Sequence, residues 1–563
     1  MTTANRPADA AIRERALDPS CSFIVQAPAG SGKTELLTRR YLRLLATVER
    51  PEEILAITFT RKAAAEMRGR ILKALALGAS DQPPPEEYKE ATWRLAKAAR
   101  AADARHGWRL EAHPARLKIQ TIDALNHTLA RQLPILSGSG AALRIADDSE
   151  PLYAQAVLRV IEHLGTDSPV ADAVERLVRH LDNQVGTLTA LLTDLLQRRD
   201  HWLDLDLLHS DRDALRARLE SALGAAVAQR LQRLGALWPG DTCHELVALA
   251  QAARDRLRTS DPSHVVAMSD PLVGFPGTAV EDLPGWRVLR QMLLTKEGGW
   301  RRQINKRDGF PPDSKPQIQR LLAIIDQLQA LDLAGGGDLA DALQETRDLP
   351  AVRYSGAQWL ALDSLLEVLK IAVAELALVF REQGEADHVA AALAGRQALG
   401  TVDEPTDLAL QLDYRLKHLL VDEFQDTSRS QIRLLRLLTA GWTPGDGRSL
   451  FLVGDPMQSI YRFREADVGL FLKLQHEGLG DLRLEPLTLT VNFRSTQPVI
   501  DWVNGAFEHV LPAKDDPERG GVRFTASGSR PGVPLEGGVH FHPLVGPKPD
   551  TQAQEARLVA KLV

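Results

Sequence analysis

The chain has 563 residues, of which 44% are hydrophobic and 25% charged, so we expect a soluble globular protein with more than one domain. It has no run of 18 apolar residues and no signal-peptide core, which predicts a cytoplasmic protein without a membrane segment, and its two cysteines exclude a disulfide framework or a four-cysteine metal site. The net charge of −6 does not indicate nucleic-acid binding, but a local basic groove would be enough for it.

Short apolar runs and amphipathic stretches alternate over residues 22–140, a pattern typical of a parallel α/β sheet. Strands are predicted at Ser22–Gln26 and Ile54–Thr58, each followed by a helix, the second from Lys62. The helix after the first strand has apolar residues at helical spacing, namely Leu36, Leu37, Tyr41, Leu44 and Leu45.

Strand-like runs are missing from about Leu152 to Val389, where Leu/Ala-rich helical stretches are broken by Gly and Pro. Strands are predicted again at 418–421, 450–453 and 487–491. The sequence therefore predicts a sheet domain that is interrupted by a large helical insertion.

The strongest chemical signal follows the first strand and opens a helix, as a phosphate-binding P-loop does. Its residues are Ala27, Pro28, Ala29, Gly30, Ser31, Gly32, Lys33 and Thr34. The two glycines let the backbone turn its N–H groups toward phosphates, and the helix N-terminus adds a positive dipole. Lys33 would reach the β- and γ-phosphates of ATP, and the Thr34 hydroxyl would bind Mg²⁺. The alternative is a glycine-rich turn with a surface lysine, which the strand–loop–helix context disfavours.

A further strand with acidic residues at its end is expected where the apolar run 419–421 leads into Asp422 and Glu423. Asp422 is a candidate Mg²⁺ ligand, and Glu423 is a candidate general base for the attacking water. Alone, such a run is more often a helix start or a turn, but a P-loop in the same chain favours the catalytic interpretation.

The block Asp422-Glu-Phe-Gln-Asp-Thr427 resembles motif II of the UvrD/Rep group of superfamily 1 helicases. Residues 57–68, 121–125, 454–464 and 492–496 resemble motifs Ia, Ib, III and IV in the same order. The insertion between motifs Ib and II is most similar to that of the RecB/AddA branch, whose members process double-strand breaks.

The resemblance implies an α/β fold with a RecA-like P-loop NTPase motor lobe, formed by residues 1–145 and 401–483. It also implies an all-helical, DNA-binding insertion over 146–400 and the start of a second RecA-like lobe over 484–563. The implied function is an ATP-dependent 3′→5′ DNA helicase or translocase in recombinational repair or break processing. Its implied partners are single-stranded DNA, a single-strand/duplex junction, and a nuclease or helicase subunit of an AddAB/RecBCD-like complex.

By the same resemblance, Gln458 would sense the γ-phosphate, and Arg464 and Arg494 would stabilise the transferring phosphoryl group. Phe493 would stack on adenine. Three aromatic residues, Phe59, Tyr461 and Phe463, would face DNA bases, although a core position is the alternative for each ring. Further DNA contacts are expected from Thr58, Thr60, Arg61 and Thr121.

Two departures from the family pattern stand out. Ile12 occupies the position of a glutamine that reads adenine, so Arg13 or Arg15 is expected to substitute for it in part. Nothing after Arg494 resembles motifs V and VI with their finger arginine, so we expect a fragment of a longer helicase.

Two other function classes were compared with the helicase. Another kind of P-loop ATPase would need a Leu-Ser-Gly-Gly-Gln-type signature, which is absent. An inactive, helicase-derived scaffolding subunit is disfavoured because Lys33, Asp422 and Glu423 are intact. Within the insertion, residues 296–307 hold five basic residues and Trp300, which predicts either a duplex-gripping patch or a solvated loop with a tryptophan anchor.

Overall fold

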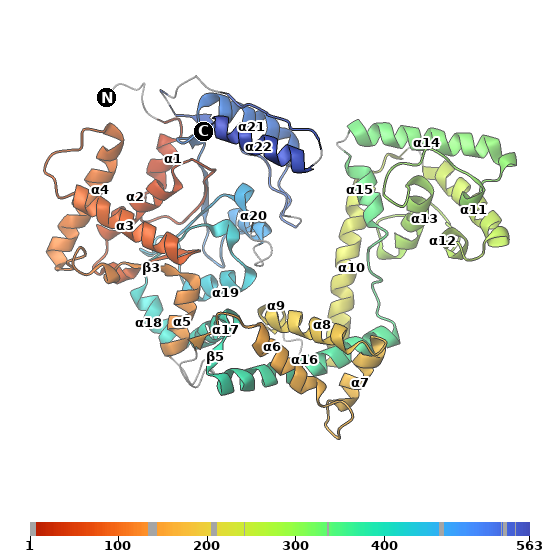
Figure 1. Cartoon of the computed structure of the whole chain (residues 1–563), viewed down its shortest axis with the longest axis horizontal. Helices are drawn as coiled ribbons and strands as arrows, with labels where there is room; N and C mark the ends of the chain where they lie inside the picture. Colours follow the sequence, from red (N-terminus) through yellow and green to blue (C-terminus); the bar gives the residue numbers. More distant parts are fainter. Residues whose placement is uncertain are drawn as a thin grey trace. The chain divides into compact units, whose positions relative to one another are not determined.

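A computed structural model of the chain describes residues 7–132, 144–203, 211–240, 243–334, 337–460, 467–518, 520–530, 532, 538–546 and 548–562. It divides into two compact units (Figure 1). The sheet unit is Met1–Leu152, Gln197–His201 and Ala377–Val563, and the helical unit is Tyr153–Leu196 and Trp202–Leu376. Among the described residues, no helix combines the length and the apolar character needed to cross a bilayer.

The sheet unit is built on six strands in the order β3-β2-β6-β7-β1-β8, and every neighbouring pair is parallel. The strands are β1 (Phe23–Gln26), β2 (Ile54–Thr58), β3 (Lys118–Thr121), β6 (His418–Val421), β7 (Ser449–Gly454) and β8 (Glu485–Thr488). The predicted bounds of β2 and β6 are confirmed. Two short pairs accompany this sheet: β4 (Arg144–Ile145) with β5 (Glu385–Ala386), and β9 (Val491–Asn492) with β10 (Gly528–Ser529).

The predicted strand over 487–491 is wrong in its bounds. The backbone N–H groups of Thr490 and Val491 donate to Oδ2 of Asp9, at 3.0 and 3.1 Å, so they do not extend the ladder with β1. Pro486 lacks an N–H, which suits the place of β8 at the edge of the sheet. The first-lobe sheet thus continues past residue 483, where the second lobe was expected to begin.

Helices cover both faces of the six-stranded sheet (Figure 1). The first face carries α1 (Ala10–Arg15), α2 (Lys33–Leu45), α3 (Arg61–Leu77) and α4 (Glu87–His106), and the second carries α5 (Ile122–Gln132), α17 (His388–Leu399), α18 (Asp407–Arg415), α19 (Arg429–Leu438) and α20 (Val468–Glu477). Alternate strand residues divide between the faces: Phe23 and Val25 join the first core, and Ile24 joins the second. Two further helices, α21 (Gln497–Val510) and α22 (Lys548–Leu562), follow the sheet in the chain.

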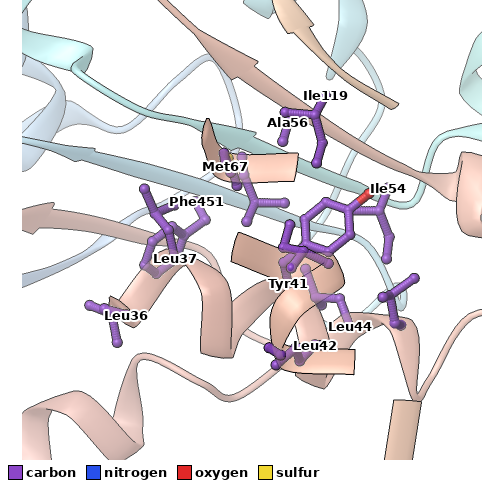
Figure 2. Packing of buried hydrophobic residues seen from close by; sticks show 14 of the residues in the cluster. Leu36, Leu37, Tyr41, Leu42, Leu44, Ile54, Ala56, Met67, Ile119 and Phe451 are labelled. Atoms are coloured by element: carbon purple, nitrogen blue, oxygen red, sulfur yellow. The ribbon is translucent and has the colours of Figure 1, made fainter. Parts of the chain in front are cut away.

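The first of these cores positions the helix that follows the P-loop. The apolar residues predicted to lie on one side of α2 are all buried (Figure 2). Tyr41 and Leu37 pack there with Phe451 of β7 and with Ile54 and Ala56 of β2 (Figure 2). This burial holds the start of α2 at the end of β1 and fixes the direction of the loop between them.

The helical unit has its own core, as the missing strand patterns predict. Its residues belong to α6 (Glu150–Ile161), α7 (Ala171–His180), α8 (Val185–Gln197), α10 (Arg212–Leu237), α11 (Cys243–Ser260), α12 (Val265–Met268), α13 (Leu283–Leu293), α14 (Lys315–Ala334), α15 (Asp338–Glu345) and α16 (Gly356–Gln383). One end of α6, α8 and α16, and most of the short α9 (Arg199–Trp202), belong to the sheet unit. The unit is narrower than the expected 146–400 because α17 packs on α5 of the sheet unit, where Gly395 lies against the backbone of Asn126.

The basic segment 296–307 combines features of both interpretations. Trp300 is an anchor, since its indole N–H donates to Asp332 Oδ2 at 3.0 Å, and Arg301 pairs with Asp308 at 2.8 Å. Lys306 and Arg307 are exposed and line an open cavity of about 920 Å³ within the helical unit.

Candidate functional site

The candidate site lies at one edge of the six-stranded sheet. Because all strands are parallel, their carboxyl ends meet at the same edge, which is where α/β proteins of this kind bind ligands. The P-loop leaves β1 there, Asp422 and Glu423 follow β6, and Asp455 follows β7.

The P-loop has the backbone that its glycines predict. Gly30 and Gly32 both have φ of 78°, in the left-handed region that side chains rarely adopt. Gly32 is the N-cap of α2, and Lys33 is the first residue of that helix. The first N–H groups of α2, which have no partner within the helix, therefore lie at the loop.

Lys33 contacts both carboxylates predicted from the sequence. Its Nζ lies 2.5 Å from Oε2 of Glu423 and 3.7 Å from Oδ1 of Asp422. Each of the three side chains keeps some exposure, so the cluster is open to solvent. A cation held by acids in this way can be transferred to a phosphate anion that enters the loop.

The two carboxylates have different proton affinities. Burial raises the pKa of Asp422. Burial also acts on Glu423, but Lys33 and a hydrogen bond from Gln425 outweigh it and lower the pKa of that carboxyl. Glu423 also has φ of 53°, a left-handed backbone that is uncommon for a side chain other than glycine. Such a conformation persists only where its surroundings enforce it.

Gln425 is a site residue that the sequence did not single out. Its Nε2 donates to Glu423 Oε2 at 2.9 Å, and its Oε1 accepts from the N–H of Asp455 at 2.9 Å. The side chain is buried and lies directly against Gly454. Gln425 thus connects the end of β6 to the end of β7. Its position two residues after Glu423, within motif II, could have identified it as a site residue.

Gln458 and Ser459 follow β7 and join the same network. Gln458 is exposed, and its amide donates to Oδ2 of Asp455. Ser459 Oγ donates to Oδ1 of Asp426 at 3.2 Å. Burial raises the pKa of Asp426 to about 6. Asp426 and Asp455 were likewise not predicted as site residues.

Motif IV lies directly on the P-loop. Asn492 Nδ2 donates to the carbonyl of Ala29 at 3.2 Å, and the N–H of Phe493 donates to the carbonyl of Gly30 at 2.8 Å. Phe493 is 38% exposed, which leaves it open to a ligand. Arg494 is exposed, and its Cβ lies beside Gly30.

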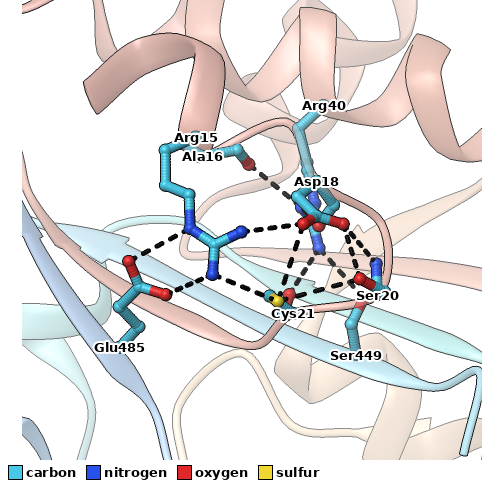
Figure 3. A network of polar contacts seen from close by, with 8 residues as sticks. All are labelled: Arg15, Ala16, Asp18, Ser20, Cys21, Arg40, Ser449 and Glu485. Carbon is cyan, nitrogen blue, oxygen red and sulfur yellow. Dashed lines mark hydrogen bonds and ion pairs between the residues drawn. The ribbon is translucent and has the colours of Figure 1, made fainter. Parts of the chain in front are cut away.

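The two arginines considered as glutamine substitutes point in different directions. Arg13 donates to both oxygens of Asp9 at 2.7 Å and lies over Phe493, with its guanidinium carbon 4.9 Å from the ring centroid. Arg15 is bound instead to Glu485 and Asp18, in the network around Arg40 (Figure 3). Only Arg13 therefore lies beside the P-loop.

The P-loop and Asp422 form a donor set that fits a nucleotide with Mg²⁺. Ser31 Oγ is buried and has no hydrogen-bond partner among the described residues, so a phosphate oxygen would satisfy it. The described residues hold no cluster of three or more histidine, cysteine or acidic groups suited to a metal. One carboxylate and one hydroxyl, from Asp422 and Thr34, nevertheless fit Mg²⁺, which keeps water and phosphate oxygens as its other ligands.

The candidate DNA-contacting residues are less uniform. Thr60 and Arg61 are exposed at the start of α3, where Thr60 Oγ1 accepts from the N–H of Ala63. Thr121 is buried, and its Oγ1 accepts from the N–H of Ala124 at the start of α5. Thr58 is buried and donates to the carbonyl of Thr60, which leaves its hydroxyl poorly placed for DNA, and Phe59 is half-buried. Three predicted residues, Tyr461, Phe463 and Arg464, lie outside the described residues.

The chain is similar in sequence to proteins that are named as helicase/nuclease subunits. The chain is 28% identical to the A subunit of the ATP-dependent helicase/nuclease of Desulfitobacterium hafniense (strain DSM 10664 / DCB-2), with 90% of this chain and 36% of that protein covered. The corresponding A subunits of Streptococcus thermophilus (strain ATCC BAA-491 / LMD-9) and Levilactobacillus brevis are each 26% identical, with 87% and 96% of this chain covered. The chain covers 38% and 40% of those two proteins.

The family model described as the UvrD/REP helicase N-terminal domain matches residues 9–248 and 369–478, which is more than half of the chain. The matched residues include the P-loop, the Asp422–Glu423 pair and Gln458, which follows β7. With the parallel sheet and its helical insertion, these findings identify the chain as a member of the UvrD/REP helicase family, with a RecA-like fold.

Proposed function

We propose that this chain is the nucleotide-hydrolysing motor part of an ATP-dependent DNA helicase. The observation that carries the proposal is the contact of Lys33, at the end of a P-loop, with both Glu423 and Asp422. The alternative, a surface lysine beside a glycine-rich turn, does not predict a contact with two acids that follow a strand far away in the sequence. In P-loop enzymes this arrangement binds phosphates and orients the attacking water.

Each residue of the cluster has a role that its contacts support. Lys33 exchanges its acidic partners for the β- and γ-phosphates of ATP. Without Lys33 beside it, Glu423 keeps the hydrogen bond from Gln425 that also lowers its pKa, so it is ionised at neutral pH and can accept a proton from water. Gln425 holds the Glu423 carboxylate in place through Nε2. Gln458 and Arg494 are exposed near the loop and are proposed to contact the γ-phosphate.

Mg²⁺ would be bound by Thr34 and Asp422 together with phosphate oxygens, and when bound it would neutralise charge that develops on the phosphates. The buried position of Asp422 supports this role, because a carboxylate with a raised pKa gains from a nearby cation. Phe493 offers an exposed ring for the nucleotide base.

DNA is the proposed track of this motor. Single-stranded DNA would contact Thr60 and Arg61, which are exposed at the start of α3, on the same sheet edge as the nucleotide. The hydrogen bond of Ser459 to Asp426 joins the nucleotide cluster to the segment that leads to Tyr461 and Phe463. We propose that this connection transmits the nucleotide state to DNA.

The pathway and the partner are proposed from the relatives. Each of these is named as the A subunit of a helicase/nuclease, and the chain spans 36–40% of their length. We propose that the full-length protein acts in repair of DNA breaks as one component of a helicase–nuclease complex.

Nucleotide binding by the 563-residue chain tests the proposal. Lys33→Ala is expected to weaken binding of a fluorescent ATP analogue with Mg²⁺, because the phosphates lose their cation. Glu423→Gln should retain binding, since it removes the acid that competes for Lys33. Lys62→Ala is the matched control, because Lys62 is exposed and pairs with the exposed Glu66 of its own helix at 4.0 Å. Equal loss of affinity in the first two variants would contradict the division of roles.

The direction of movement is proposed to be 3′→5′, on the resemblance of motifs Ia to IV. The full-length protein should displace a duplex that carries a 3′ single-stranded tail in a gel assay. Displacement from 5′ tails alone would reverse this assignment.

A further inference from the structure

The helical unit contains a cavity that the proposed motor function does not use. It lies among α11, α12, α13 and α14, which gather in one part of the unit (Figure 1). Its volume of about 920 Å³ falls in the range of ligand-binding pockets, roughly 300–1,000 Å³. All of its lining residues lie between Leu257 and Ile318, so the helical unit forms the cavity alone.

The floor of the cavity is apolar. Leu257, Ile304 and Phe310 line it and are buried in the core of the helical unit. Ile318 of α14 also lines it and is only half-buried. A bulky apolar side chain that entered the cavity would therefore exchange water for hydrocarbon and ring atoms, which is favourable.

The lining also carries an excess of positive charge. Lys306 and Arg307 are exposed, and neither pairs with an acid within the described residues. Two acids belong to the lining, but Asp308 pairs with Arg301 at 2.8 Å. Among the described residues, this leaves Asp261 as the one lining acid without a cationic partner. The cavity should therefore attract an anionic partner.

The turn that carries the two cations is fixed by its neighbours. Asn305 Oδ1 accepts from the N–H of Arg307 at 2.8 Å, and Asp308 Oδ2 accepts from the N–H of Asn305 at 3.0 Å. Gly309 follows with φ of 85°, and a Cβ there would lie 2.7 Å from the carbonyl oxygen of Ala253 in α11. The turn is thus packed closely on α11, and a preformed surface of this kind lowers the entropic cost of binding.

The surface beside the cavity favours a protein over a nucleic acid as the occupant. Helix α12 begins directly after the lining residue His264, and its Val265 and Met268 are 55% and 67% exposed. Phosphates of DNA could pair with the two cations, but they would leave the apolar floor unfilled, and Asp261 would repel them. A peptide that carries acidic residues beside a bulky apolar side chain matches both the floor and the cations.

We propose that this cavity is a docking site for an acidic segment of another protein. The segment inserts a leucine or phenylalanine side chain onto the apolar floor and places its carboxylates at Lys306 and Arg307. The side-chain amides of Gln291 and Asn305, which also line the cavity, can bind its peptide groups. The nucleotide site belongs to the sheet unit, so this inference goes beyond the proposed function and does not depend on it.

Two labelled peptides and the 563-residue chain test the proposal by fluorescence anisotropy. The first peptide has Leu-Phe at its centre and only Asp and Glu on either side. The second has Ser-Ser in place of Leu-Phe and the same charge. The first is expected to bind, and the second should bind at least about tenfold more weakly because the apolar burial is lost.

A cavity-filling variant places the binding. Ser260 is exposed and lines the cavity, and its hydroxyl donates to the carbonyl of Arg256 in the same helix. Ser260→Trp should therefore fill the cavity without removing a core contact, and it should weaken binding of the first peptide at least about tenfold. Thr259→Trp is the matched control, because Thr259 is the exposed neighbour that does not line the cavity.

A second pair of variants tests the charges. Lys306→Ala combined with Arg307→Ala should weaken binding of the first peptide by roughly 2- to 30-fold, as expected for two exposed ion pairs. Lys73→Ala combined with Lys370→Ala is the matched control. It removes the same charge from exposed positions outside the lining and should leave the affinity unchanged.

Several outcomes would overturn the proposal. Equal binding of the two peptides would show attraction by charge alone, and no binding of the first peptide would exclude an acidic segment. Binding that neither Ser260→Trp nor the double variant at Lys306 and Arg307 alters would place the peptide elsewhere. If a labelled DNA duplex bound instead, and Ser260→Trp abolished that binding, the occupant of the cavity would be DNA.

Discussion

Replacing Gly454 by alanine is expected to destabilise the sheet unit and disturb the nucleotide site, although it adds only one methyl group. Gly454 ends β7 with an ordinary backbone conformation, so strain in φ is not the cause. A Cβ at this position would overlap Oε1 of Gln425 and lie 3.0 and 3.1 Å from the backbone nitrogens of Gln425 and Phe424. Real side chains essentially never come so close, so Gln425 must move.

The size of the effect follows from these contacts. Overpacking a filled interior costs about 1–3 kcal/mol. Moving Gln425 also breaks its 2.9 Å hydrogen bond with the N–H of Asp455 and leaves a buried group unsatisfied, which costs about 1–3 kcal/mol more. A total of about 2–6 kcal/mol corresponds to a fall in melting temperature on the order of 5 °C. Glu423 would lose its orienting hydrogen bond at the same time.

Calorimetric melting of the Gly454→Ala chain measures this loss, with Gly69→Ala as the matched control. Gly69 lies inside α3 with nothing within 4 Å of the Cβ position, so the same substitution there should stabilise the chain by about 0.5–1 kcal/mol. If Gly454→Ala melted together with the wild-type chain, the close packing of Gln425 against β7 would not be a structural requirement.

The remaining predictions concern a titrating acid and the base-binding ring. Burial raises the pKa of Asp426 from 3.8 to about 6, so folding favours its protonated form, and its contribution to stability is complete below about pH 4 and lost as the pH rises through 6. In urea titrations, Asp426→Asn should therefore gain stability relative to wild type between pH 4 and 7, whereas a constant difference would contradict the raised pKa. Phe493→Ala should weaken ATP binding by roughly 5- to 100-fold through lost stacking, with tripolyphosphate binding unchanged. Equal weakening of both ligands would assign Phe493 to the P-loop fold instead.

Much of the site is determined locally and was therefore readable in the sequence. The P-loop depends on two glycines that adopt left-handed backbone conformations between a strand and a helix. The glycines, the strand and the helix are adjacent in the chain, so the sequence alone indicates the loop. Asp422 and Glu423 follow an apolar run, and such a run is typical of a buried parallel strand. Because parallel strands end at one edge, the loops after β1 and β6 bring Lys33 to these acids, a contact that was not predicted.

Other features depend on partners far away in the chain, so only the tertiary structure decided them. The apolar pattern of residues 487–491 suggests a strand, yet the carboxylate of Asp9 takes the N–H groups of 490 and 491 and ends the ladder early. Arg13 and Arg15 are equivalent in the sequence, and they are distinguished only because Asp9 binds one and Glu485 the other. Gln425 became a site residue for the same reason: its two partners lie on different strands, and a hydrogen bond between distant segments leaves no periodic signal in either one.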